Sequence, residues 1–163
     1  MRIAVFGSGG LGGYLGGKLS QSGEEVIFIA RGEHLKAIRK HGLQIDSTEG
    51  NFVVYPELAT DDPNEIGKVD TVILGVKTWQ VLESAEAMRP MIGPETAVIP
   101  LQNGVDAPSQ LAETLGAKHV VIGICIIRSF ISGPGRLCHT FGVDPNLKLG
   151  EMRESPIKRV ENL

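Results

Sequence analysis

A cluster of glycines near the N-terminus constrains the fold of this chain more than any other feature. Gly7-Ser8-Gly9-Gly10-Leu11-Gly12 fits the pattern GxGxxG and directly follows a short apolar run at residues 3–6. A helical stretch with leucines at four-residue spacing comes next and is closed by Gly23. The sequence therefore predicts a strand, a tight turn and a helix, which is the context in which this pattern binds the pyrophosphate of a dinucleotide.

Each glycine of the pattern has a physical reason. Gly7 permits the tight turn, Gly9 lets the backbone approach a pyrophosphate, and Gly12 lets the helix and the strand pack closely. Four glycines lie between residues 12 and 17, where a helix is expected, and together they forgo roughly 3–4 kcal/mol of helix propensity relative to alanine. This cost indicates a close approach of the helix to a sheet or to a ligand, although a glycine-rich turn without a ligand stays an alternative.

Apolar runs alternate with helical patterns as far as residue 115, and the pattern then becomes fully β. We expect strands at 3–6, 25–30, 70–76, 96–101, 120–129, 136–141 and 147–150, a hairpin within 43–55, and helices at 33–40, 80–91 and 107–115. Alternating strands and helices favour an α/β fold. We predict a Rossmann-like, doubly wound and mostly parallel sheet with an antiparallel C-terminal extension.

The end of the second expected strand bears on which dinucleotide is bound. NAD-selective sites carry an acid there, which accepts hydrogen bonds from the adenosine ribose. This chain has no acid at that position, and Arg31 follows the strand. A guanidinium offers a planar fork of donors that suits a 2′-phosphate, so the sequence favours NADP(H). A surface arginine that caps the next turn is the alternative.

Polar residues follow two further strands. Lys77 comes after Val76, and Asn103 comes two residues after Leu101. The carboxyl ends of parallel strands line the ligand crevice of an open α/β sheet, so we expect both side chains to face the cofactor. The alternatives are a solvated surface lysine and an Asn-Gly turn that needs no ligand.

Composition excludes several other classes of protein. The 163 residues carry a formal net charge of -3, which favours neither nucleic acid nor an anionic membrane as a partner. The longest apolar run, residues 120–127, is far shorter than the ~20 residues that span a bilayer. We expect a soluble, cytoplasmic protein with two reduced thiols, no metal site and no nucleophilic triad. His34 and His41 are expected on an exposed helix and receive no role.

Five segments together resemble one family. They are the glycine-rich turn, Arg31-Gly32-Glu33-His34-Leu35, Val76-Lys77-Thr78-Trp79-Gln80, Leu101-Gln102-Asn103-Gly104 and Leu149-Gly150-Glu151. In this order, over nearly the whole chain, they are similar to ketopantoate reductase (2-dehydropantoate 2-reductase). The resemblance implies NADPH-dependent reduction of 2-dehydropantoate to pantoate, a step of pantothenate and coenzyme A biosynthesis. It also implies that the cofactor contacts are Gly7, Ser8, Gly9, Gly10, Leu11, Gly12, Arg31, Lys77, Asn103 and Ser129, with Asn103 also near the substrate.

The family has a second, helical domain that supplies its general-acid lysine and most substrate contacts, and this chain ends at Leu163. The resemblance therefore implies an NADP-binding Rossmann domain at 1–152, with 153–163 starting the connection to an absent helical substrate domain. We expect no catalytic residue here, and NADPH binding with little or no reductase activity.

The expected partners are a small 2-oxo acid and either the missing helical domain or a second copy, through an apolar face left exposed. Two alternatives stay open. The chain could be a stand-alone dinucleotide-binding or redox-sensing module, or part of a related dehydrogenase that acts on another 2-oxo acid or an opine.

Overall fold

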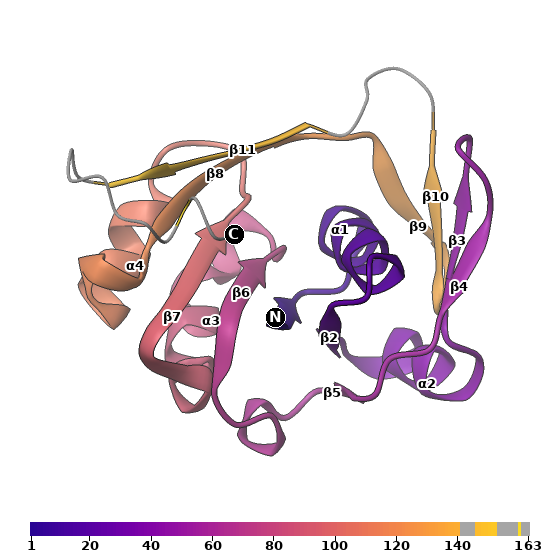
Figure 1. Ribbon diagram of the computed structural model, residues 1–163, viewed down its shortest axis with the longest axis horizontal. Coiled ribbons are helices and arrows are strands. Elements are labelled where there is room, and N and C mark those ends of the chain that lie inside the picture. The colour runs from indigo at the N-terminus through magenta and orange to yellow at the C-terminus, as the bar shows by residue number, and fades with distance from the viewer. Residues whose placement is uncertain (141–145, 153–159, 161–163) are drawn as a thin grey trace.

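A five-stranded parallel sheet forms the centre of the molecule. The computed structural model describes residues 1–140, 146–152 and 160 (Figure 1). The strands lie in the order β5-β2-β1-β6-β7, and their bounds are β1 Arg2–Phe6, β2 Glu25–Ile29, β5 Ala59–Thr60, β6 Val69–Leu74 and β7 Ile92–Pro100. The chain thus starts in the middle of the sheet and builds it outward in both directions. This order confirms the predicted Rossmann-like, doubly wound fold.

Helices cover both faces of the central sheet. Their bounds are α1 Gly10–Gln21, α2 Gly32–His41, α3 Val81–Ala87 and α4 Ala107–Leu115, with short 3-10 helices η1 Pro63–Glu65, η2 Thr78–Gln80, η3 Arg89–Met91 and η4 Ala117–His119. Successive strand residues point to opposite faces, so Val5 packs with Tyr14 of α1, whereas Phe6 packs with Val81 of α3. The helix expected at 80–91 is shorter than predicted because Pro90, which has no N–H to donate, lies in η3.

A second, four-stranded sheet has the order β4-β3-β10-β9. It comprises β3 Leu43–Ser47, β4 Phe52–Val54, β9 Ser129–Gly133 and β10 Arg136–His139. The predicted hairpin is confirmed by the antiparallel pairing of β3 with β4. The predicted antiparallel extension appears in the pair β9–β10 and in a separate pair of β8 Val121–Ile126 with β11 Asn146–Glu151. The sequence did not reveal that β10 also pairs with β3, in parallel.

Helix α1 lies between the central sheet and this second sheet (Figure 1). A Cβ atom on Gly16 would lie 2.7 Å from side-chain atoms of both Val5 and Phe28 in the central sheet. A Cβ atom on Gly13 would lie 2.7 Å from Leu137 in the second sheet. Glycines on two sides of the helix therefore permit a close approach to two sheets, which accounts for their cost in helix propensity.

Some expectations fall outside the described residues. They are the strand end at Phe141, the turn expected at 144–146 except Asn146, and the connecting segment from residue 153, of which Val160 alone is described. Val160 packs against the hydrophobic cluster on the α1 side of the central sheet. Both cysteines are free. Among the described residues, no helix has the length and apolar character needed to cross a membrane.

Candidate functional site

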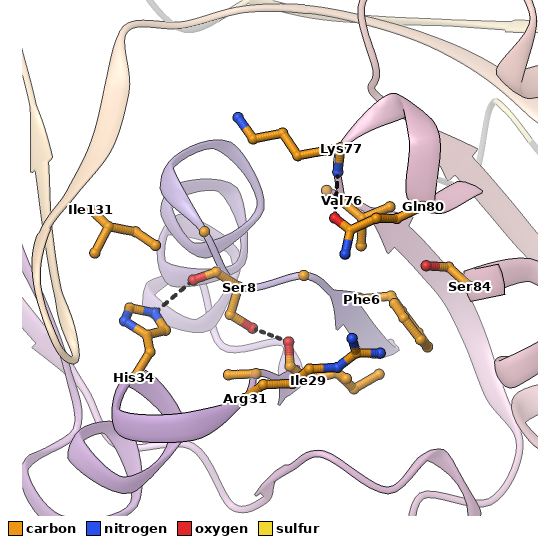
Figure 2. Close-up of a pocket in the computed structure, with 14 residues that line it drawn as sticks. Phe6, Ser8, Ile29, Arg31, His34, Val76, Lys77, Gln80, Ser84 and Ile131 are labelled. Atoms are coloured by element: carbon orange, nitrogen blue, oxygen red, sulfur yellow. Dashed lines mark hydrogen bonds between the residues drawn. The ribbon is translucent and has the colours of Figure 1, made fainter. Parts of the chain in front are cut away.

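Two adjoining cavities lie at the carboxyl ends of the central strands, and we call them together the cleft. The first has a volume of about 290 Å³ and extends from the glycine-rich loop to Arg31 (Figure 2). The second has a volume of about 660 Å³ and extends from the loop to Asn103 and Ser129. Residues that line both are Gly9, Gly75, Val76, Lys77 and Ile131. In open α/β sheets this edge is where ligands bind.

The glycine-rich loop joins β1 to α1 with a tight turn. Gly7 adopts a φ of +97°, which confirms the predicted role of the first glycine. The N–H groups of Gly7 and Ser8 both donate to the carbonyl oxygen of Ile29, at 3.2 and 3.1 Å. The side chain of Ser8 is buried and donates to the same oxygen at 3.0 Å. Ser8 therefore lines the cleft with its main chain, because its hydroxyl is turned toward β2.

The start of α1 presents free N–H groups to the cleft. Gly13 donates to the Gly9 carbonyl oxygen at 2.7 Å, so the N–H groups of residues 10–12 precede the first helical turn and have no acceptor within the helix. They carry the positive end of the helix dipole. A Cβ atom on Gly9 would meet nothing closer than Ile131, at 3.9 Å. The loop is thus open on this side to a bound group.

Two other glycines of the loop are required because the backbone packs against them within the protein. A Cβ atom on Gly12 would overlap the carbonyl oxygen of Gly7, which confirms close packing as the role of the third glycine. A Cβ atom on Gly10 would overlap the carbonyl group of Ser129 at the start of β9. The sequence did not indicate this contact, because Ser129 is far away along the chain.

Arg31 lies at the end of β2 and lines the first cavity. It is the N-cap residue of α2, yet its side chain makes no capping hydrogen bond. The guanidinium Nη2 lies 3.8 Å from Oε1 of Glu83, and both side chains are mostly exposed. An exposed pair of this kind is weak, so the guanidinium is available to another anion.

Lys77 and Asn103 both line the cleft, as their positions after β6 and β7 predicted. Lys77 lines both cavities, and its main-chain N–H donates to Oε1 of Gln80 at 3.2 Å (Figure 2). Gln102 donates from Nε2 to the carbonyl oxygens of Leu74 and Val76, at 2.7 and 3.0 Å. Gln102 therefore fastens the end of β7 to the end of β6.

Two buried polar atoms of the second cavity lack a partner. They are Oγ of Ser129 and Oε1 of Gln102. Because buried polar atoms are nearly always hydrogen-bonded, both are positions where a bound molecule can supply a partner. Ser129 was expected at the cofactor, whereas Gln102 was not singled out in the sequence.

The expectation that His34 lies exposed on its helix is wrong. Its ring is half-buried, lines the first cavity and contacts the glycine-rich loop through the carbonyl oxygen of Ser8. The helix turns this residue toward the cleft and leaves His41 exposed. The signal available in the sequence was the position of His34 three residues after the end-of-strand arginine.

The charge of the cleft suits an anionic ligand. Within the part of the chain that the structure describes, its lining includes Arg31 and Lys77 and no aspartate or glutamate, although the chain as a whole has a net charge of -3. Burial raises the pKa of the Cys125 thiol, which lines the second cavity, so this group stays protonated at neutral pH. No cluster of metal-ligating side chains occurs among the described residues.

A strand, a glycine-rich turn and an open helix N-terminus at the crevice of a doubly wound sheet define a Rossmann-like dinucleotide-binding domain. The family described as Ketopantoate reductase PanE/ApbA matches residues 3–154. The chain belongs to the ketopantoate reductase family.

Three known proteins illustrate the similarity. "Uncharacterized oxidoreductase YkpB" of Bacillus subtilis is 36% identical over 140 residues, which are 86% of this chain and 46% of that protein. The crystal structure of 2-dehydropantoate 2-reductase from Porphyromonas gingivalis superposes with a TM-score of 0.92 at 32% identity, over 99% of this chain and 58% of that one. D-mandelate dehydrogenase, solved with NADH and anilino(oxo)acetate, superposes with a TM-score of 0.87 at 26% identity, over 99% and 51%. The chain spans about half the length of the curated relatives it matches, 46% and 43% for two of them.

Proposed function

We propose that this chain is the cofactor-binding domain of an NADPH-dependent reductase that converts 2-dehydropantoate to pantoate. The observation that carries the proposal is Arg31, which lines the first cavity at the end of β2 where NAD-selective domains carry an acid. Arg31 and Lys77 also give the lining of the cleft positive charge, which favours a cofactor with the additional 2′-phosphate.

Each part of the cleft has a role in this proposal. The N–H groups at the start of α1 bind the diphosphate, and the guanidinium of Arg31 binds the 2′-phosphate through its fork of donors. Lys77 contacts the cofactor as a point charge. Asn103 and Ser129 hydrogen-bond the nicotinamide end from the second cavity, and Asn103 also contacts the substrate.

The chemistry requires a proton donor besides the cofactor. A reduced nicotinamide supplies the hydride, and a general acid must protonate the oxygen of the reduced carbonyl group. The lining of the second cavity offers Lys77, assigned to the cofactor, and Cys125, whose raised pKa makes it a poor acid at neutral pH. We therefore assign cofactor binding to this chain and no general acid.

A related 2-oxo acid is the second candidate substrate. It is favoured by the similarity to D-mandelate dehydrogenase, whose structure holds NADH and anilino(oxo)acetate. The carboxylate of Glu83 beside Arg31 also favours a cofactor without a 2′-phosphate, since it competes for the same guanidinium. Cofactor preference therefore separates the two candidates.

Calorimetric titration of the purified chain with NADPH and with NADH tests the proposal. We expect NADPH to bind about tenfold or more tightly than NADH, which corresponds to one or two charge-assisted hydrogen bonds. Equal dissociation constants would refute the assignment of NADP. If neither nucleotide bound at millimolar concentration, dinucleotide binding itself would be refuted.

A further inference from the structure

His34 connects three separate elements of the fold with one imidazole ring. It belongs to α2, its Nε2 lies 2.9 Å from the carbonyl oxygen of Ser8, and its Nδ1 accepts from the N–H of Gly135 at 3.0 Å. Ser8 belongs to the glycine-rich loop, and Gly135 belongs to the turn between β9 and β10. Figure 2 shows the contact between the ring and Ser8 beside the first cavity.

Both contacts are satisfied by a single state of the ring. The N–H of Gly135 can only donate, so Nδ1 must be the unprotonated nitrogen that accepts from it. The proton of the neutral imidazole is then on Nε2, which donates to the carbonyl oxygen of Ser8. The two backbone partners thus select one tautomer, and both ring nitrogens of His34 are hydrogen-bonded.

The contact with Ser8 fixes the direction of the next N–H group. In a trans peptide the carbonyl and the N–H point in opposite directions, and the described chain contains no cis peptide. Because the Ser8 carbonyl points to His34, the N–H of Gly9 points to the other side of the loop. No hydrogen bond within the described part of the chain uses that N–H group.

The contact with Gly135 fixes the turn that lies against α2. Gly135 has a φ of +67°, and a Cβ atom there would lie 2.8 Å from Cβ of Ala37. The strand before this turn carries Ile131, which lines both cavities and is the nearest side chain to the open face of Gly9. The position of the turn therefore sets the gap between Gly9 and Ile131, where the two cavities meet.

We propose that His34 is a positioning residue for the diphosphate of the cofactor. By joining the loop to the β9–β10 turn, it orients the N–H of Gly9 and holds the width of the passage between Gly9 and Ile131. This inference rests on the proposed function, because it assumes that a dinucleotide crosses that passage. It adds a specific role for a side chain that need not touch the cofactor.

The test compares two ligands in the wild type and in His34→Ala. NADPH carries a diphosphate that must cross the passage, whereas 2′-AMP carries the 2′-phosphate and no diphosphate. Quenching of the fluorescence of Trp79, the one tryptophan in the sequence and a residue of the second cavity, reports NADPH binding. Binding of 2′-AMP is measured by its displacement of NADPH, followed through the same fluorescence. We expect the dissociation constant for NADPH to rise about tenfold, the effect of losing one or two hydrogen bonds, and that for 2′-AMP to change by less than about twofold.

Two conservative variants separate positioning from general stability. The side-chain amide of His34→Gln can still donate to Ser8, and that of His34→Asn can still accept from Gly135. Each should bind NADPH with an affinity between those of the wild type and His34→Ala. His41→Ala, which removes an exposed imidazole from the same helix, should leave both affinities unchanged.

Three results would overturn the inference. NADPH affinity in His34→Ala could equal that of the wild type, both ligands could lose affinity in parallel, or neither amide variant could recover any binding. If the wild type bound neither ligand, the proposed function would fail first and this inference with it, so the two failures are distinguishable.

Discussion

At the scale of single residues, the proposed preference for NADPH rests on Arg31. Its guanidinium lies at the end of β2, and within the described residues its one ion-pair partner is Glu83, at 3.8 Å. Because both side chains are mostly exposed, the pair contributes little and can give way to a phosphate. Arginine also offers a fork of parallel donors that lysine lacks.

Substitution of Arg31 should therefore change selectivity rather than binding as such. We expect Arg31→Ala to weaken NADPH binding about tenfold or more, the value of a lost charge-assisted contact, with little change for NADH. The NADPH affinity of Arg31→Lys should lie between those of the wild type and Arg31→Ala, because lysine keeps the positive charge and lacks the fork of parallel donors. Calorimetry with both nucleotides measures this. A parallel loss of NADH affinity would show that Arg31 supports the fold of the cleft instead.

At the scale of elements, α1 is held between two sheets by residues that have no side chain. Gly16→Ala should destabilise the protein although alanine is the better helix former, because its Cβ would lie 2.7 Å from Val5 and Phe28. Overpacking of a core costs about 1–3 kcal/mol, which exceeds the roughly 1 kcal/mol gained in helix propensity. Urea denaturation measures the difference. Gln21→Ala, at the end of the same helix, is the control that should change little.

The parallel pairing of β3 with β10 carries a pH-dependent contact. Arg136 donates from Nε to Asp46 at 2.6 Å and from Nη2 at 3.2 Å. This bond holds the pKa of Asp46 below its usual value. A carboxyl with a lowered folded pKa stabilises the protein above its unfolded pKa, about 3.9, and this contribution disappears as pH falls through the folded pKa.

Asp46→Asn should accordingly lower the Tm slightly at pH 7, and the difference from the wild type should shrink as pH falls below about 3.9 and vanish below the folded pKa of Asp46. It should also shrink in high salt, because the pair is exposed. Thermal denaturation of both proteins across this pH range provides the measurement. A Tm difference that persisted unchanged at pH 3 would contradict the ionic origin of the contact.

The sequence predicted those elements whose signal is local. Apolar runs ending at glycine, arginine, lysine or glutamine located β1, β2, β6 and β7 and hence the ends where Arg31, Lys77 and Asn103 lie, whereas the two-residue β5 was not predicted. The pairing of β10 with β3 could not be predicted in this way, because it joins Leu137 to Ile45 across the sequence. The contacts of His34 with Gly135 and of Gly10 with Ser129 also join residues that are far apart in the sequence. A local sequence pattern does not show which strand lies beside a given residue.

At the scale of the whole molecule, apolar side chains on two consecutive strands face outward. They are Ile124 and Ile126 of β8, which are 60% and 56% exposed, and Phe130 of β9, which is 51% exposed at the rim of the cleft. Burial of such a surface is favourable by about 25 cal/mol per Å² of apolar area. An exposed set of this kind is typical of a surface that contacts another protein element.

We therefore predict that the chain self-associates as its concentration rises. Sedimentation at micromolar to millimolar concentration should show species larger than the monomer, and the double substitution Ile124→Lys and Ile126→Lys should reduce them. Monomeric behaviour of the wild type at the highest concentration would contradict this prediction. The exposed Tyr55→Lys, on the loop after β4, serves as a control that should leave association unchanged.

The most direct test of the account is to locate the bound cofactor through backbone amide NMR signals. On titration with NADP⁺, the signals of Gly9, Gly10, Leu11 and Lys77 should move most, because these residues line the cleft. The signal of Gly50, at the tip of the β3–β4 hairpin, should stay in place. If the signals of the glycine-rich loop did not move at saturating NADP⁺, or if the largest changes fell outside the cleft, the central claim would be contradicted.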